Sequence, residues 1–236
     1  MLVVGFPTGA LQANCYLIAA GKGAPCVIVD PGQDAADAVA KAVREHGLSP
    51  VAAVLTHGHF DHCFAVTPIC DGDGIPAYIH PDDRDLLSDP LKGVSTDTAA
   101  FFGGKLQMRE PREVRELADE AVLDLAGLSI TVDHTPGHTQ GSVTFRCDTE
   151  EGGRLLFAGD TLFAGSIGRT DLPGGDVRQM ASSLRTKILT LADDTVVLPG
   201  HGPTTTIGRE RGTNPFLAGL EEGSEDSTAQ GPLRGL

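Results

Sequence analysis

The 236-residue sequence has little positive charge, because 18 lysines and arginines stand against 32 aspartates and glutamates, for a net charge of −14. Such a charge repels a phosphate backbone, so we do not expect nucleic acid as a partner. No run approaches the roughly 20 apolar residues that span a bilayer. The first residues, "MLVVGFPTGALQANCY", lack the basic segment that opens a secretory signal. We therefore expect a cytoplasmic protein that does not contact a membrane.

Cysteine is scarce, and its distribution gives no sign of disulfide pairing. The cysteines are odd in number and lack CxxC spacing, at Cys15, Cys26, Cys63, Cys70 and Cys147. This distribution argues against a disulfide framework and favours reduced, buried thiols. Cys63 directly follows His62, so it can lie near the motif described below. The alternative is that Cys63 is simply a small buried apolar side chain.

Short apolar runs bounded by glycine, proline or aspartate predict buried strands. Four such runs come early, around residues 2–6, 15–20, 26–30 and 51–55. Residues 34–47 begin with aspartate, follow a helical apolar spacing and end with glycine, which predicts a helix. A second set of strands is predicted around 121–134, 142–147, 152–160 and 194–200, with a helix within 174–190. Two strand-rich halves that each carry helices indicate two packed sheets flanked by helices.

The length suits one catalytic domain, which we place at residues 1–218. Within it, residues 89–112 carry few periodic signals and are typical of an excursion that forms a lid or a substrate wall. Residues 219–236 are polar and contain glycine, so we expect a flexible C-terminal tail. The sequence gives no indication of the oligomeric state.

The stretch "THGHFDH", residues 56–62, places three histidines and an aspartate directly after a predicted strand. Residues two apart in extended or turning backbone point to the same side, so His57 and His59 can reach one cation. Asp61 and His62 follow where a turn into a helix can direct them to a second point. Because a catalytic tetrahedral ion needs only three protein ligands, this motif suits two metal ions better than one.

Three further metal-capable side chains lie where later strands are predicted to end. His138 lies in "TPGHTQGS", Asp160 ends "LLFAGD" and His201 ends "VVLPGH". A carboxylate can bridge two cations, because it offers two oxygens and a negative charge. We therefore predict two divalent ions that share Asp160. The other ligands of the first ion are His57, His59 and His138, and those of the second are Asp61, His62 and His201. Zinc is the first expectation, and iron or manganese suits the same donors.

Two residues near these motifs are candidates for a supporting role. Asp30 ends a predicted strand, where its carboxylate can hold a ligand imidazole or cap its own turn. His134 lies close enough to His138 in the sequence to support it, and a purely structural role is the alternative.

The remaining candidates have simpler interpretations. His46 precedes a glycine and is expected at a helix C-terminus, and His80 is expected in a loop or beside a helix N-cap. Arg169, in "SIGRTD", is a candidate substrate anchor, with an internal ion pair to Asp171 as the alternative.

Four segments together carry a family resemblance: "THGHFDH", "TPGHTQGS", "FAGDTLFAGSIGRTDLPGGD" and "LPGHGPTTTIGRE". They resemble the metallo-β-lactamase fold superfamily and, within it, the small glyoxalase II-like (hydroxyacylglutathione hydrolase-like) hydrolases. The match runs from "NCYLI" to "NPFL", nearly the whole chain. It implies an αββα, four-layer sandwich of two mixed β-sheets flanked by helices. It also implies a dinuclear site where the sheets meet, with the same seven ligands.

The resemblance implies a metal-dependent hydrolase that uses a metal-bridging hydroxide to cleave a small-molecule thioester. Asp61 would also orient that hydroxide. A thiolate can leave without a dedicated acid, because a thiol has a pKa of about 8.5. Full-length relatives bind glutathione through a C-terminal region that is nearly absent here, so the thiol carrier stays open. The alternatives are a persulfide dioxygenase of the same fold with one iron, a lactone or lactam hydrolase, and a metal-stabilised binding module without turnover.

Overall fold

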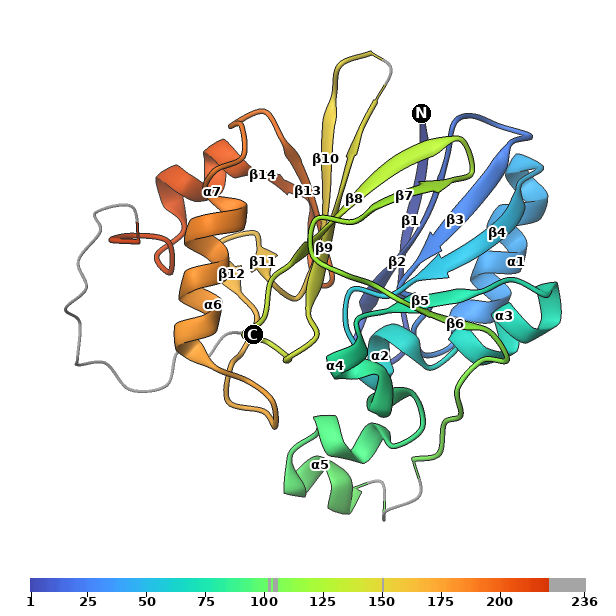
Figure 1. Ribbon diagram of the computed structural model, residues 1–236, viewed down its shortest axis with the longest axis horizontal. Helices are drawn as coiled ribbons and strands as arrows, with labels where there is room; N and C mark the ends of the chain where they lie inside the picture. The colour runs from blue at the N-terminus through green and yellow to red at the C-terminus, as the bar shows by residue number, and fades with distance from the viewer. Residues whose placement is uncertain (102, 104–105, 150, 221–236) are drawn as a thin grey trace.

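The computed structural model describes residues 1–101, 103, 106–149 and 151–220. Two six-stranded β-sheets face each other, and helices cover the outer surface of both (Figure 1). The predicted αββα sandwich is therefore confirmed. From residue 221 onward, the predicted C-terminal tail lies outside the described residues. Within the described part of the chain, no helix combines the length and the apolarity that crossing a membrane requires.

The first sheet has the strand order β1-β2-β3-β4-β5-β6. Its antiparallel part comprises β1 (Leu2–Thr8), β2 (Ala13–Ala19) and β3 (Pro25–Val29), and its parallel part continues with β4 (Ser49–Val54), β5 (Ala77–Ile79) and β6 (Val114–Glu116). The helices α1 (Ala35–His46) and α3 (Val66–Asp73) connect parallel strands and cover the outer face of this sheet (Figure 1). Helix α1 is capped at its C-terminus by Gly47, as the sequence predicted. Gly47 has a left-handed φ of 66°, and its N–H donates to the Arg44 oxygen.

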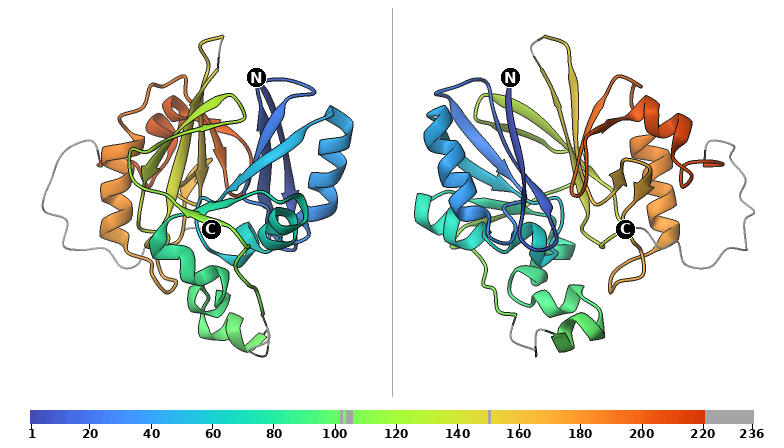
Figure 2. Two further views of the ribbon diagram at one scale, coloured as in Figure 1. Left: turned by 45° about the vertical axis from the view of Figure 1, so that its right-hand side comes forward. Right: turned by 180° about the vertical axis from the view of Figure 1, so that it is seen from behind.

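The second sheet has the strand order β14-β13-β10-β9-β8-β7. Its strands are β7 (Val122–Leu125), β8 (Leu128–His134), β9 (Val143–Asp148), β10 (Arg154–Gly159), β13 (Val196–Pro199) and β14 (Thr205–Thr206). A small hairpin, β11 (Leu162–Phe163) and β12 (Ser166–Ile167), follows β10. The helix α6 (Val177–Ser183), a π-helical turn (Leu184–Ile188) and α7 (Ile207–Thr213) cover the outer face (Figure 2).

Neighbouring residues on the strands belong to different apolar layers. Ile18 and Phe157 pack between the two sheets, whereas the preceding residues Leu17 and Leu156 pack outward in the layers that include the helices. Because side chains alternate between the two faces of a strand, a strand buried on both faces is apolar at almost every position. This explains the continuous apolar runs that predicted the strands.

Some elements escaped the sequence analysis. The strands β5 and β6 have three residues each, too few to show a pattern. The excursion predicted at 89–112 contains short helices, which are part of a longer segment with α4 (Pro81–Arg84), η1 (Asp85–Leu87), η2 (Pro90–Gly93) and α5 (Thr96–Phe101). All five cysteines are buried and free, as predicted.

The packing between the sheets can be tested at Phe157, which is 1% exposed and meets the Tyr16 ring edge-on at a centroid distance of 5.5 Å. We expect Phe157→Ala to lower the free energy of unfolding by about 3–5 kcal/mol, because it removes apolar contacts and leaves a cavity. Val122→Ala, on a strand residue that is 55% exposed, should change it by less than about 0.5 kcal/mol. Urea unfolding measures both, and similar values for the two variants would contradict this packing.

Candidate metal centre

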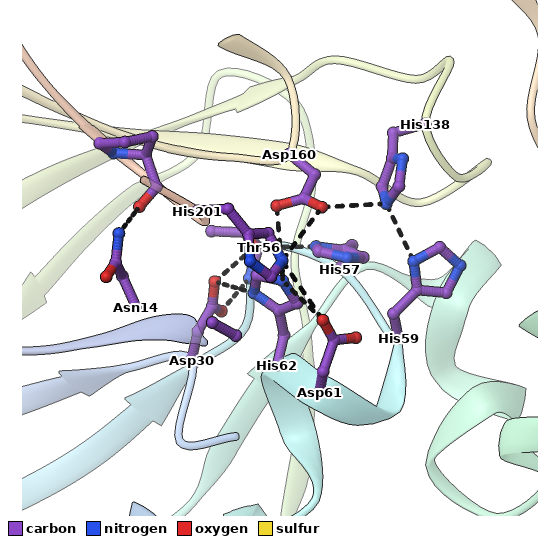
Figure 3. A network of polar contacts seen from close by, with 12 residues as sticks. Asn14, Asp30, Thr56, His57, His59, Asp61, His62, His138, Asp160 and His201 are labelled. Carbon is purple, nitrogen blue, oxygen red and sulfur yellow. Dashed lines mark hydrogen bonds and ion pairs between the residues drawn. The ribbon is translucent and has the colours of Figure 1, made fainter. Parts of the chain in front are cut away.

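The predicted ligands come from four chain segments that each follow a strand. The loop and short helix α2 (Phe60–Cys63) after β4 carry the "HGHFDH" residues, and the loop between β8 and β9 carries His138. Asp160 directly follows β10, and His201 lies two residues after β13. The first sheet therefore supplies one motif and the second sheet supplies three single residues. Figure 3 shows their side chains converging on one point between the sheets.

The structure brings all seven predicted ligands together. Their nitrogen and oxygen atoms lie within 4.8 Å of one another in three overlapping groups: His57, His59 and His138; His57, His62 and Asp160; Asp61, His62 and His201. The first and third groups are the two sets that the sequence analysis predicted. Within these sets, His59 Nδ1 is 2.9 Å from His138 Nε2, and His62 Nε2 is 3.2 Å from His201 Nε2.

Asp160 lies between the two sets. One carboxylate oxygen is 3.5 Å from His138 Nε2 and 3.7 Å from His201 Nε2, and the other is 3.4 Å from His62 Nε2. Asp61, by contrast, is 3.6 Å from His62 Nε2 and 3.3 Å from His201 Nε2, both in its own set. Asp160 therefore has the position that a bridging carboxylate needs.

The cluster suits divalent cations for two reasons: the chemistry of its donor atoms, and a buried nitrogen that has no hydrogen-bond partner. His57 Nε2 is buried and has no hydrogen-bond partner among the described residues. Leaving a buried polar atom unpaired costs about 1–3 kcal/mol. Imidazole and carboxylate donors suit divalent transition metals, and a cation at the centre of the cluster would satisfy this nitrogen.

Burial and the neighbouring charges determine the protonation of these groups. Burial, with a further contribution from His62, holds the pKa of His57 well below its usual value, and burial followed by the nearby His138 lowers the pKa of His59 to about 3. Both rings are therefore neutral, which is the form that binds a metal. Burial disfavours the charged form of His62, but Asp160 and Asp61 outweigh it and raise the pKa of His62 to about 10. The same carboxylates would attract a cation.

Two residues orient the ligand imidazoles from outside the cluster. Asp30 accepts hydrogen bonds from the backbone N–H and the hydroxyl of Thr56, at 2.8 and 2.6 Å, and its Oδ2 lies 3.1 Å from His62 Nδ1. The Thr56 hydroxyl is in turn 3.1 Å from His57 Nδ1. The contact predicted for Asp30 is thus present. Thr56 was missed, although it opens the motif, because the sequence does not show what its hydroxyl contacts.

On the other side of the cluster, His138 Nδ1 lies 2.8 Å from the backbone oxygen of Arg169, which orients its ring. His134 stacks on His80 at a centroid distance of 4.1 Å, and its Nε2 lies 2.8 Å from the backbone oxygen of Gln140. It therefore supports the loop of His138 and not the ring itself, and its effect on the site stays a prediction. His80 is itself the N-cap of α4 and accepts from the backbone N–H of Asp82, whereas the sequence predicted a loop position or a neighbour of an N-cap.

The two sheets are joined beside the cluster by contacts that no motif indicated. The Asn14 side chain donates to the Pro199 oxygen at 3.0 Å (Figure 3). Its backbone N–H donates to the Gly200 oxygen at 2.7 Å. The Tyr16 hydroxyl donates to the same Pro199 oxygen at 2.8 Å. Both side chains come from β2, so the first sheet holds the segment that carries His201.

A cavity of about 860 Å³ opens over the cluster. The excursion after β5 forms part of its wall, as predicted, through residues that include Val94, Ser95 and Thr98. Arg169 also lines the cavity, and its guanidinium donates to both oxygens of Asp171 at 2.7 and 2.9 Å. The predicted ion pair is therefore present, but it is partly exposed and not internal, and the role of Arg169 as a substrate anchor stays a prediction.

Metal-capable side chains gathered from both sheets, at the open edge of an αββα sandwich, are the arrangement of a metallo-hydrolase. The sequence profile of the metallo-beta-lactamase superfamily matches residues 8–201, and the chain belongs to this superfamily. An uncharacterized protein of Mycobacterium tuberculosis is 48% identical, over 93% of this chain and 99% of its own length. The hydroxyacylglutathione hydrolase GloC of Haemophilus influenzae is 36% identical, over 89% of this chain and 95% of its own length.

Solved structures agree with this assignment. The B3 metallo-beta-lactamase BLEG-1 is 38% identical, with a TM-score of 0.81 over 92% of this chain and all of that one. The protein TTHA1623, in a di-iron-bound form, is 41% identical, with a TM-score of 0.74 over 91% of this chain and all of that one.

The position of Asp160 between the two sets gives a testable difference. We expect Asp160→Asn to lower the metal content per chain more than Asp61→Asn, because Asp160 contacts both sets and Asp61 only one. Elemental analysis of the two purified variants, with circular dichroism as a control for folding, measures the difference. Equal losses of metal would show that Asp160 does not bridge.

Proposed function

We propose that this chain is a metal-dependent hydrolase that cleaves a thioester of a small molecule. The observation that carries the proposal is the joint opening of both ligand sets, with Asp160 between them, onto one cavity. The 36% identity to a hydroxyacylglutathione hydrolase supports a thioester as the bond that is cleaved. The free, buried cysteines suit a reducing compartment, and we propose that the enzyme acts in the cytoplasm.

In this proposal, His57, His59 and His138 would hold one divalent cation. The second would be held by Asp61, His62 and His201, and Asp160 would be shared. When bound, the cations would lower the pKa of a water molecule and polarise the carbonyl of the substrate. We propose zinc, since imidazole and carboxylate ligands are common at catalytic zinc. The same donors accept iron, and the di-iron-bound neighbour supports iron as the alternative.

The residues of the chain would position the reactants. Burial raises the pKa of the Asp61 carboxyl, but His62 and a hydrogen bond from His201 outweigh it and hold the pKa well below its usual value. A bound cation would favour the ionised form of Asp61 in the same way, and the carboxylate could then accept a hydrogen bond from the attacking water. Hydrolysis consumes one water, breaks the acyl carbon–sulfur bond and releases a carboxylic acid and a thiol. The thiol has a pKa of about 8.5 and can leave as thiolate, so the site needs no separate acid.

Lactam hydrolysis is a second candidate, favoured by the 38% identity and high structural similarity to a B3 metallo-beta-lactamase. A metal-loaded, untagged protein should be assayed with a panel of hydroxyacyl thioesters, a chromogenic lactam and a lactone, and with a persulfide in an oxygen electrode. We expect thioester cleavage to give the highest kcat/KM. Preferential lactam or lactone cleavage, or oxygen consumption with persulfide, would replace the thioester proposal.

The ligand assignment predicts the behaviour of two variants. His57→Ala and His138→Ala should each abolish thioester turnover and lower the metal content, because each removes a ligand from the same set. His46→Ala, at the C-terminal end of α1, is the control and should keep wild-type turnover. Circular dichroism checks the fold. Near wild-type activity with full metal content in either site variant would show that the assignment is wrong.

Arg169 can be tested separately, because its pair with Asp171 is partly exposed, at 42% and 30% for the two side chains. Exposed ion pairs contribute about 0–1 kcal/mol, so Arg169→Ala should leave the melting temperature nearly unchanged. If Arg169 anchors the substrate, KM rises and kcat changes little. Arg178→Ala removes an exposed charge on α6 and serves as the control. An unchanged KM for Arg169→Ala would remove the anchor role.

A further inference from the structure

Asp83 is a buried carboxylate that no motif singled out. It lies in α4, at the start of the excursion that forms the cavity wall, and it is only 1% exposed. Neither the proposed ligand sets nor the residues that orient the rings include it. A carboxylate buried to this degree requires hydrogen bonds to satisfy its oxygens, so its partners indicate what it does.

The partners of Asp83 lie on the two loops that supply the three-histidine set. Its Oδ2 accepts from the backbone N–H of Gly58 at 2.9 Å and from the Thr139 hydroxyl at 2.7 Å. Its Oδ1 accepts from the backbone N–H of Gly141 at 2.8 Å. Gly58 lies between His57 and His59, and Thr139 directly follows His138 in the sequence. One carboxylate therefore links the backbones on both sides of this set.

The close approach of Asp83 accounts for a glycine in each of the two motifs. A Cβ atom added to Gly58 would lie 2.8 Å from the backbone oxygen of Asp83. A Cβ atom added to Gly141 would lie 2.7 Å from the backbone nitrogen and from Cγ of Asp83. Both distances are shorter than real Cβ contacts, so a side chain at either position would push the loop away from Asp83. The two loops and α4 are thus fitted to one another around this carboxylate.

The other contacts in this region join the two loops elsewhere, at the rings of His59 and His138, which are 2.9 Å apart, and at the start of the loops. The rings of His57 and His138 are oriented by Thr56 and by the Arg169 oxygen, each on its own side of the site. The Val143 N–H donates to the Thr56 oxygen at 2.7 Å, which joins the sheets where the loops begin. Beyond that point, Asp83 links the two backbones from α4, because it accepts one hydrogen bond from the loop of His57 and His59 and two from the loop of His138.

We propose that Asp83 is a positioning residue of the metal centre, whose carboxylate sets the spacing between the loop of His57 and His59 and the loop of His138. Metal binding tolerates deviations of only about 0.2 Å in ligand distances, so the separation of the loops controls affinity. Hydrogen bonds to a charged acceptor are stronger than those between neutral groups, which makes a carboxylate suited to hold two loops together. This inference rests on the ligand assignment of the proposed function.

The first test is Asp83→Asn, which keeps the shape of the side chain but replaces one acceptor by a donor that faces N–H and O–H groups. We expect at least about ten-fold weaker zinc binding, because partners of this kind typically change metal affinity by about 10–100-fold. The visible spectrum of the cobalt-substituted protein should also change, since it reports ligand geometry. Asp82→Asn makes the same change at the neighbouring exposed residue and should retain wild-type affinity and spectrum.

A second pair of variants decides the question if Asp83→Asn does not fold. Thr139→Val keeps the size of the buried side chain and removes the hydroxyl that donates to Asp83, whereas Thr139→Ser retains the hydroxyl. We expect weaker zinc binding and an altered cobalt spectrum for Thr139→Val, and near wild-type behaviour for Thr139→Ser.

The outcomes separate this inference from the proposed function. If the wild-type chain binds no divalent cation, both are overturned. If the wild-type chain binds metal and cleaves thioesters, but folded Asp83→Asn or the pair of Thr139 variants bind zinc as tightly and with the same cobalt spectrum, only the role of Asp83 is overturned.

Discussion

The gathering of five imidazoles and two carboxylates at one point, most of them buried, is the constraint on which the rest of this structure depends. Such groups lose their hydration on folding, and His57 Nε2 gains no hydrogen bond in return. The cost is tolerable because a large apolar core stabilises the chain and because the rings of His57, His62 and His138 are held at Nδ1. The apolar layer between the sheets, and those on their outer sides, supply that core.

The αββα sandwich suits the assembly of this cluster, because strands of both sheets end at the same edge. The first sheet delivers four ligands on a single turn, and the second delivers one ligand from each of three loops. Asn14 and Tyr16 join the sheets at Pro199, and Asp83 joins the loops above. The site is therefore assembled from segments of both sheets that hydrogen bonds hold together.

In the proposed function, substrate choice would depend on a different part of the chain. The ligand cluster can serve thioesters, lactams or lactones, because the chemistry at the carbonyl is the same. The cavity wall is formed in part by the excursion after β5 and by the segment around Arg169. These segments lie outside the ligand motifs, so relatives with the same cluster can act on different molecules.

The sequence by itself determined the fold class, the principal strands and helices, and the seven side chains that converge. Those signals are local: an apolar run, a capped helix, or a histidine at the end of a strand can each be recognised within a few residues. The short strands β5 and β6, the stacking of His134 on His80, and the roles of Thr56, Asn14, Tyr16 and Asp83 were decided only by the tertiary structure. Their partners lie far away in the sequence, such as Pro199 for Asn14, 185 residues on, and Gly141 for Asp83, 58 residues on. A hydrogen bond between such residues leaves no periodicity or spacing in the chain, because it exists only once the sheets have packed and brought their loops together.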